Sequence, residues 1–152
     1  MKKLAWLLLL TTGAGCANRH FKVTEAISQA RVSGVRGQGT TITYTLTLQP
    51  GTTQLLSFDT LWIGQEGLAV QFNRSATAGP KEPLRITAFR TQLPADAGDY
   101  ASPDNPAPAV APPGPKPPFA YEGAALLRYS VKGQTHYRVI KELKILPEGV
   151  MK

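Results

Sequence analysis

TITYTLTL, at residues 41–48, alternates threonine with larger side chains and decides the fold class. The alternation places Ile42, Tyr44, Leu46 and Leu48 on one face and the four threonines on the other. Successive side chains of a strand point to opposite faces, so this period of two predicts a strand with one buried face. Threonine and tyrosine also suit a pleated surface. The QPGT that follows at 49–52 predicts a tight turn.

The same period recurs on both sides of this segment. Residues 54–64, QLLSFDTLWIG, carry apolar side chains on both faces, which predicts a central strand with Trp62 as a core anchor. The GQEG at 64–67 is typical of a hairpin loop. Further strand candidates lie at residues 21–27, 68–72 and 84–89.

Two alternating runs near the C-terminus predict a hairpin. Residues 121–131 precede the KGQ at 132–134, and the second run extends from Tyr137 to Ile145. Opposed residues of a hairpin share a face, and we align Tyr129 with Tyr137 on that ground. This register requires a loop of three or five residues centred on Gly133. It also sets Arg128 opposite Arg138.

About seven strand candidates and no sustained helical period predict an all-β fold. We expect an immunoglobulin-like or fibronectin-like antiparallel β-sandwich that spans residues 21–152 as one domain. Residues 93–118 hold nine of the thirteen prolines and interrupt the strands. Proline removes backbone donors, so we expect one long exposed loop there. Few core interactions should then depend on residues 95–117.

The N-terminus has the layout of a secretion signal. Lys2 and Lys3 precede seven apolar residues, LAWLLLL, which are too few to span a bilayer. The small residues Ala14 and Gly15 then lead to Cys16, the only cysteine of the chain. This stretch resembles a bacterial lipoprotein signal peptide, from which it departs at Gly13, where a branched apolar residue is usual. The resemblance implies a signal peptide over 1–15, an acylated Cys16, a tether over 16–20 and attachment to a membrane of the bacterial cell envelope, facing the periplasm.

The charge is mildly basic. The net charge of +7 falls to +5 when Lys2 and Lys3 leave with the signal, too little to favour a nucleic-acid partner. The final hairpin gathers basic side chains that could bind an anionic envelope polymer or a lipid headgroup. These candidate anion-binding residues are Arg128, Lys132, His136, Arg138 and Lys144.

Catalytic motifs are missing from the sequence. His20 and His136 lie in no recognisable nucleophile or zinc motif, and no phosphate-binding glycine loop is present. We therefore expect no enzyme, no cofactor and no metal site. Two functions stay open, an accessory module that docks onto an envelope protein, and a glycan- or lipid-binding module that uses the basic hairpin. Exposed aromatic side chains near the basic residues would favour the second.

Overall fold

The chain folds into eight β-strands without a helix, within the part that the structure describes. The structure is a computed structural model that describes residues 20–34, 37–51, 55–73, 82–95, 104 and 112–151. The strands are β1 (Phe21–Ser33), β2 (Thr40–Pro50), β3 (Leu56–Ile63), β4 (Glu66–Asn73), β5 (Leu84–Gln92), β6 (Ala125–Val131), β7 (Gln134–Ile140) and β8 (Lys144–Met151). The all-β prediction is confirmed, with one strand more than expected.

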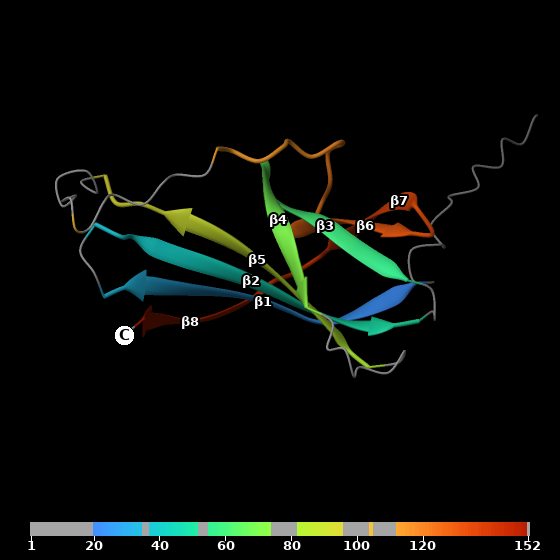
Figure 1. Cartoon of the computed structure of the whole chain (residues 1–152), viewed down its shortest axis with the longest axis horizontal. Coiled ribbons are helices and arrows are strands. Elements are labelled where there is room, and N and C mark those ends of the chain that lie inside the picture. Colours follow the sequence, from blue (N-terminus) through green and yellow to red (C-terminus); the bar gives the residue numbers. More distant parts are fainter. Residues whose placement is uncertain are drawn as a thin grey trace, which may run out of the picture.

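All eight strands belong to one curled sheet in the order β7-β6-β3-β4-β5-β2-β1-β8. The curl occurs at β4, which changes neighbours along its length. Residues 66–69 of β4 pair with β3, and residues 70–73 pair with β5. Figure 1 shows β4 between the two parts of the sheet, with β3, β6 and β7 on one side and β5, β2, β1 and β8 on the other.

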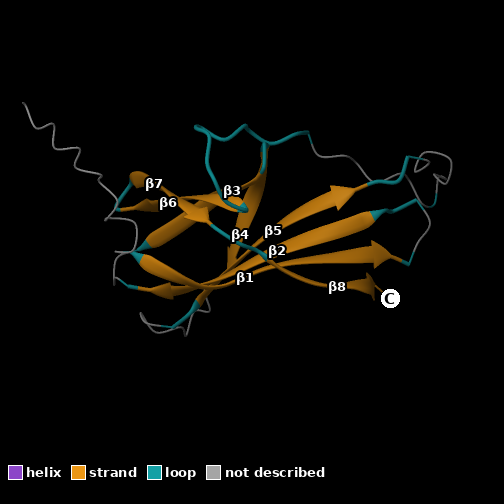
Figure 2. Cartoon of the chain, turned by 180° about the vertical axis from the view of Figure 1, so that it is seen from behind, coloured by secondary structure: helices purple, strands orange, loops and turns teal. Residues whose placement is uncertain are grey.

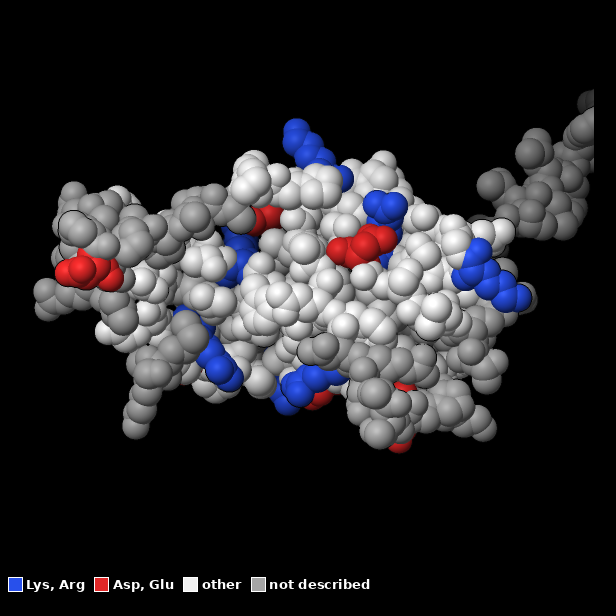
Figure 3. Space-filling view, in the orientation of Figure 1, with Lys and Arg blue, Asp and Glu red and all other residues white. Residues whose placement is uncertain are grey.

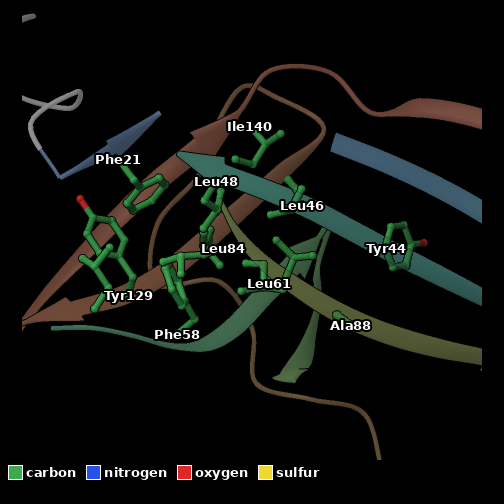
Figure 4. Packing of buried hydrophobic residues seen from close by; sticks show 14 of the residues in the cluster. Phe21, Tyr44, Leu46, Leu48, Phe58, Leu61, Leu84, Ala88, Tyr129 and Ile140 are labelled. Atoms are coloured by element: carbon green, nitrogen blue, oxygen red, sulfur yellow. The ribbon is translucent and has the colours of Figure 1, made fainter. Parts of the chain in front are cut away.

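The concave side of the sheet holds the hydrophobic core (Figure 4). Tyr44, Leu46 and Leu48 are buried there, which confirms the face predicted from the alternation in 41–48. Phe21 and Tyr129 meet edge to face with ring centroids 4.8 Å apart, so β1 packs against β6 across the core. The remaining buried members include Leu56, Phe58, Leu61, Leu68, Leu84, Ile86, Ala88, Ala125, Leu127, Val131 and Ile140.

The turn between β6 and β7 differs from the prediction. Val131 pairs with Gln134, so the loop holds only Lys132 and Gly133. Both residues have positive φ, 51° and 78°, as in the type I′ turn that matches the twist of a two-residue hairpin. The prediction of a loop of three or five residues is therefore wrong, and Tyr129 faces His136 rather than Tyr137.

The last strand also departs from the prediction of an antiparallel sandwich. The strand expected to run from Tyr137 to Ile145 ends at Ile140, and residues 141–143 carry the chain to the other edge of the sheet. There β8 lies parallel to β1, with Ile27 opposite Lys144. Val139, Leu143 and Ile145 keep the same phase of two, so alternation alone did not show that the chain leaves this strand after Ile140.

Candidate functional site

The outer, convex face of the sheet carries a second buried cluster. Trp62 pairs with Leu126, which pairs with Val139, so these three side chains project away from the concave core. Trp62 and Leu126 are nonetheless 3% and 0% exposed. A side chain on the convex face can be buried only if another segment covers it.

That segment is the end of the proline-rich connection between β5 and β6. We call residues 112–121 the proline strap; Figure 2 shows this loop running along β3 and β4. The Trp62 indole nitrogen donates a hydrogen bond of 2.8 Å to the Pro115 carbonyl. We expected few core interactions to depend on residues 95–117, and within that range Pro115 contacts this one buried side chain.

Two glycines allow the strap to approach the sheet. A Cβ on Gly67 would lie 2.6 Å from the Pro115 carbonyl oxygen, and a Cβ on Gly114 would collide with the backbone of Gly67. Such distances leave no room for a side chain on either residue. The strap and β4 thus meet backbone to backbone.

Tyr121 fixes the other end of the strap. Its hydroxyl lies 3.1 Å from the Trp62 carbonyl oxygen and 3.0 Å from the Gly64 carbonyl oxygen, and it can donate its one proton to either. Burial raises the pKa of the Tyr121 hydroxyl above its ordinary 10.0. Tyr121 is therefore held protonated at neutral pH, as a donor must be.

A groove of about 570 Å³ opens between the strap and the convex face of β3, β4 and β5. Its wall combines an exposed aromatic ring, Phe89, with charged and hydroxyl side chains. The remaining lining residues are Asp59, Thr60, Glu66, Gly67, Leu68, Ala69, Gln71, Arg90, Thr91, Leu93, Pro112, Gly114 and Pro115.

The charges of this groove are balanced. Arg90 forms an ion pair of 2.9 Å with Glu66. Arg128, just outside the groove, places its Nε 3.4 Å from Asp59 Oδ1. That Nε is buried and makes no hydrogen bond to any described residue, whereas the side chain as a whole is 43% exposed. The guanidinium group of Arg128 thus presents donors to the surface.

An aromatic pair continues the groove beyond Arg128. In register, Ala69, Thr60, Arg128 and Tyr137 form one row across β4, β3, β6 and β7 on the convex face. Tyr137 contacts Phe119 of the strap edge to face, with centroids 5.2 Å apart, and both rings are exposed. We call this row, with Phe119 and the groove, the convex-face site.

The predicted anion-binding residues do not gather on one surface. Arg128 lies on the convex face beside Tyr137, whereas His136 and Arg138 pair with Tyr129 and Leu127 and share the concave side. Lys132 lies in the turn and Lys144 on β8, at the opposite edge of the sheet. On the face seen in Figure 3, Lys and Arg side chains lie apart from one another. Arg128 does not face Arg138, and anion binding by these residues stays a prediction.

Other predictions fall outside the described residues, or find no counterpart elsewhere. Cys16 and the signal segment are not among the described residues. No described helix is long and apolar enough to cross a membrane. Comparison with family models, with curated proteins and with solved structures finds no match to this chain.

Proposed function

We propose that this chain is a lipid-anchored, non-catalytic binding module of the bacterial cell envelope, which faces the periplasm and holds an envelope glycan on its convex-face site. The single observation that supports a glycan as the ligand is the exposed aromatic pair of Phe119 and Tyr137 beside Arg128. Exposed aromatic rings near a basic residue are the feature expected of a binding module rather than of an accessory protein.

We further propose that the fold is an immunoglobulin-like sandwich. The support is the strand order, in which β4, β3, β6 and β7 adjoin in one part of the sheet and β5, β2 and β1 in the other. Immunoglobulin-type domains divide their strands in the same way. On this proposal β4 is the strand that changes sheets, and β8 is an addition to one edge.

The chemistry of the convex-face site favours a sugar over an anionic headgroup. A sugar ring has a face of C–H groups that packs on an aromatic ring, and hydroxyls that exchange hydrogen bonds with carboxylate and guanidinium groups. Here each arginine is matched by an acid, Arg90 by Glu66 and Arg128 by Asp59. An anion would gain little from a surface without net charge.

The membrane partner follows from the anchor. An acylated Cys16 lies four residues before His20, and four residues span at most about 14 Å. The end of the domain with His20 and the β6–β7 turn would therefore lie close to the lipid. One acyl chain holds a protein only marginally, so a firm attachment needs more than one chain.

Docking onto an envelope protein is the second candidate. Its specific support is Ile145, which is 81% exposed on the edge strand β8. An apolar side chain on an unpaired edge suits strand addition by a partner. The two candidates use surfaces on different strands, so they can be tested separately.

Cosedimentation of the full chain, in detergent, with isolated cell-wall glycan tests the first candidate. We expect Tyr137→Ala and Arg128→Gln each to weaken binding, the first by about two- to tenfold. Ile145→Ala, which truncates an exposed apolar side chain away from the site, is the control and should bind as the wild type does. Unchanged glycan binding in both site variants would overturn the glycan proposal. Loss of an envelope crosslink in Ile145→Ala alone would favour the second candidate.

A further inference from the structure

The two histidines of the chain, 116 positions apart in sequence, lie side by side in the fold. His20 precedes β1 and His136 lies in β7, and their ring centroids are 5.0 Å apart. Both are partly exposed. The convex-face site and its proposed ligand do not involve either of them.

Both histidines are held in place by neighbouring groups. The carbonyl of His20 accepts a hydrogen bond of 2.8 Å from the Gly51 amide, which fixes the backbone before β1 begins. The His20 Nδ1 lies 3.2 Å from the Tyr129 hydroxyl. Tyr129 in turn pairs in register with His136 and stacks on its ring at 5.4 Å. One buried tyrosine therefore positions both imidazoles.

The separation of the two ring centroids matches that of two imidazoles bound to one metal ion. Two imidazoles that bind one tetrahedral zinc through nitrogens at about 2.1 Å have ring centroids about 5 Å apart. A histidine ligand commonly makes a hydrogen bond to an oxygen through its other ring nitrogen. When His20 Nδ1 carries the proton and donates it to Tyr129, the His20 Nε2 keeps its lone pair for a metal.

We propose that His20 and His136 form a two-histidine site for a divalent transition metal such as Zn²⁺, Ni²⁺ or Cu²⁺. Imidazole nitrogens suit these ions, whereas Ca²⁺ and Mg²⁺ require oxygen ligands. The described residues contain no group of three or more His, Cys, Asp or Glu side chains that could hold a metal together. Two coordination positions are thus left to water or to a ligand from outside these residues. Arg138 lies two positions along β7 on the same side, and its positive charge repels a cation. The metal must therefore be held by coordination to the imidazole nitrogens and not by electrostatic attraction alone.

Zinc titration of the full chain, in detergent, tests the site, with Cys16→Ser in every sample so that the thiol contributes nothing. The probe is ZnCl₂, and the readout is calorimetry together with the imidazole proton resonances, of which this chain has only two sets. We expect one zinc per chain and simultaneous shifts of both histidines. His20→Gln and His136→Gln should each abolish this binding at the zinc concentration that saturates the parent.

Two further variants separate coordination from structure. Tyr129→Phe keeps the buried ring and removes only the hydroxyl that orients His20, so zinc affinity should fall about tenfold or more. Thr135→Ala, an exposed neighbour of His136 on the same strand, should bind zinc as the parent does. If either His variant retained the parent affinity with its fold intact by circular dichroism, or if zinc shifted only one imidazole, the two-histidine site would be wrong.

Discussion

The indole nitrogen of Trp62 donates a hydrogen bond of 2.8 Å to the carbonyl of Pro115, which joins the convex face of β3 to a proline-rich loop 53 residues away. A buried indole needs a partner for its N–H, and no neighbouring strand can supply one, because strand carbonyls lie in the plane of the sheet. The strap supplies it. The wall of the groove exists because this contact holds the strap against β4.

Gly67→Ala should lift the strap. Its Cβ would lie 2.6 Å from the Pro115 carbonyl oxygen and 3.0 Å from Trp62 Nε1, both in the contact that closes the strap. We expect a loss of about 1–3 kcal/mol in the free energy of unfolding, the usual effect of overpacking. Trp6 lies in the proposed signal peptide, so Trp62 is the only tryptophan after cleavage and its emission should shift to the red.

Gly149→Ala is the control for that variant. The nearest atom to its Cβ is Arg31 Cγ at 3.7 Å, an ordinary contact. Its emission spectrum should match that of the wild type. An unchanged spectrum in Gly67→Ala as well would show that the strap does not depend on this close approach.

Gly133→Ala should destabilise the β6–β7 hairpin through its backbone alone. Gly133 has φ of 78°, and no atom beyond its two chain neighbours lies within 4 Å of an added Cβ, so contacts with the rest of the fold contribute nothing. We expect a loss of about 1 kcal/mol, measured by urea unfolding. Lys132→Asn should have the opposite effect, because asparagine tolerates the positive φ of 51° better than lysine does. Equal stability of all three proteins would contradict the type I′ turn.

This hairpin also shows where the sequence stopped being informative. Alternation identified the strands at 41–48, 54–64, 68–72 and 84–89, because burial on one face leaves a period that the residues carry themselves. It did not identify the partner of each strand. We aligned Tyr129 with Tyr137 because opposed residues of a hairpin share a face, but the two-residue turn sets Tyr129 opposite His136.

The convex-face site was even harder to predict from the sequence. The sequence marked Trp62 as buried, which is correct, but gave no sign that a distant loop would cover it from outside. Pro115 and Gly114 resembled the rest of a proline-rich segment. The contact between His20 and His136 likewise depends on the tertiary fold, which brings the start of β1 close to β7, and no local sequence pattern indicates it.

Stability should fall in alkaline solution through Tyr121. Burial holds the pKa of its hydroxyl above 10.0, so the folded state keeps a proton that the unfolded state releases first. The contribution of this group is therefore complete below about pH 10 and is lost as the pH rises through the folded-state value. Tyr121→Phe should be less stable at about pH 8, where the donated hydrogen bond is missing, and should lose less between about pH 8 and pH 11. Urea midpoints at the two pH values measure the difference, and parallel losses in both proteins would exclude Tyr121 as the source.

Cys16 should carry lipid in the mature protein. The thiol directly follows the small residues Ala14 and Gly15, and the apolar segment LAWLLLL ends a few positions before them. This arrangement suits cleavage before Cys16 and acylation of its sulfur. Each buried methylene adds about 0.8 kcal/mol to membrane attachment, so a multiply acylated chain should partition wholly into the detergent phase. Cys16→Ser should either stay as the uncleaved precursor or appear in the aqueous phase, while Cys16 in the wild type should show the added mass of its acyl groups. Ile145→Ala, which leaves the N-terminus untouched, should partition like the wild type. An unmodified Cys16 at the start of the mature chain would contradict the anchor, and the domain would then reach its ligand from solution rather than from the membrane.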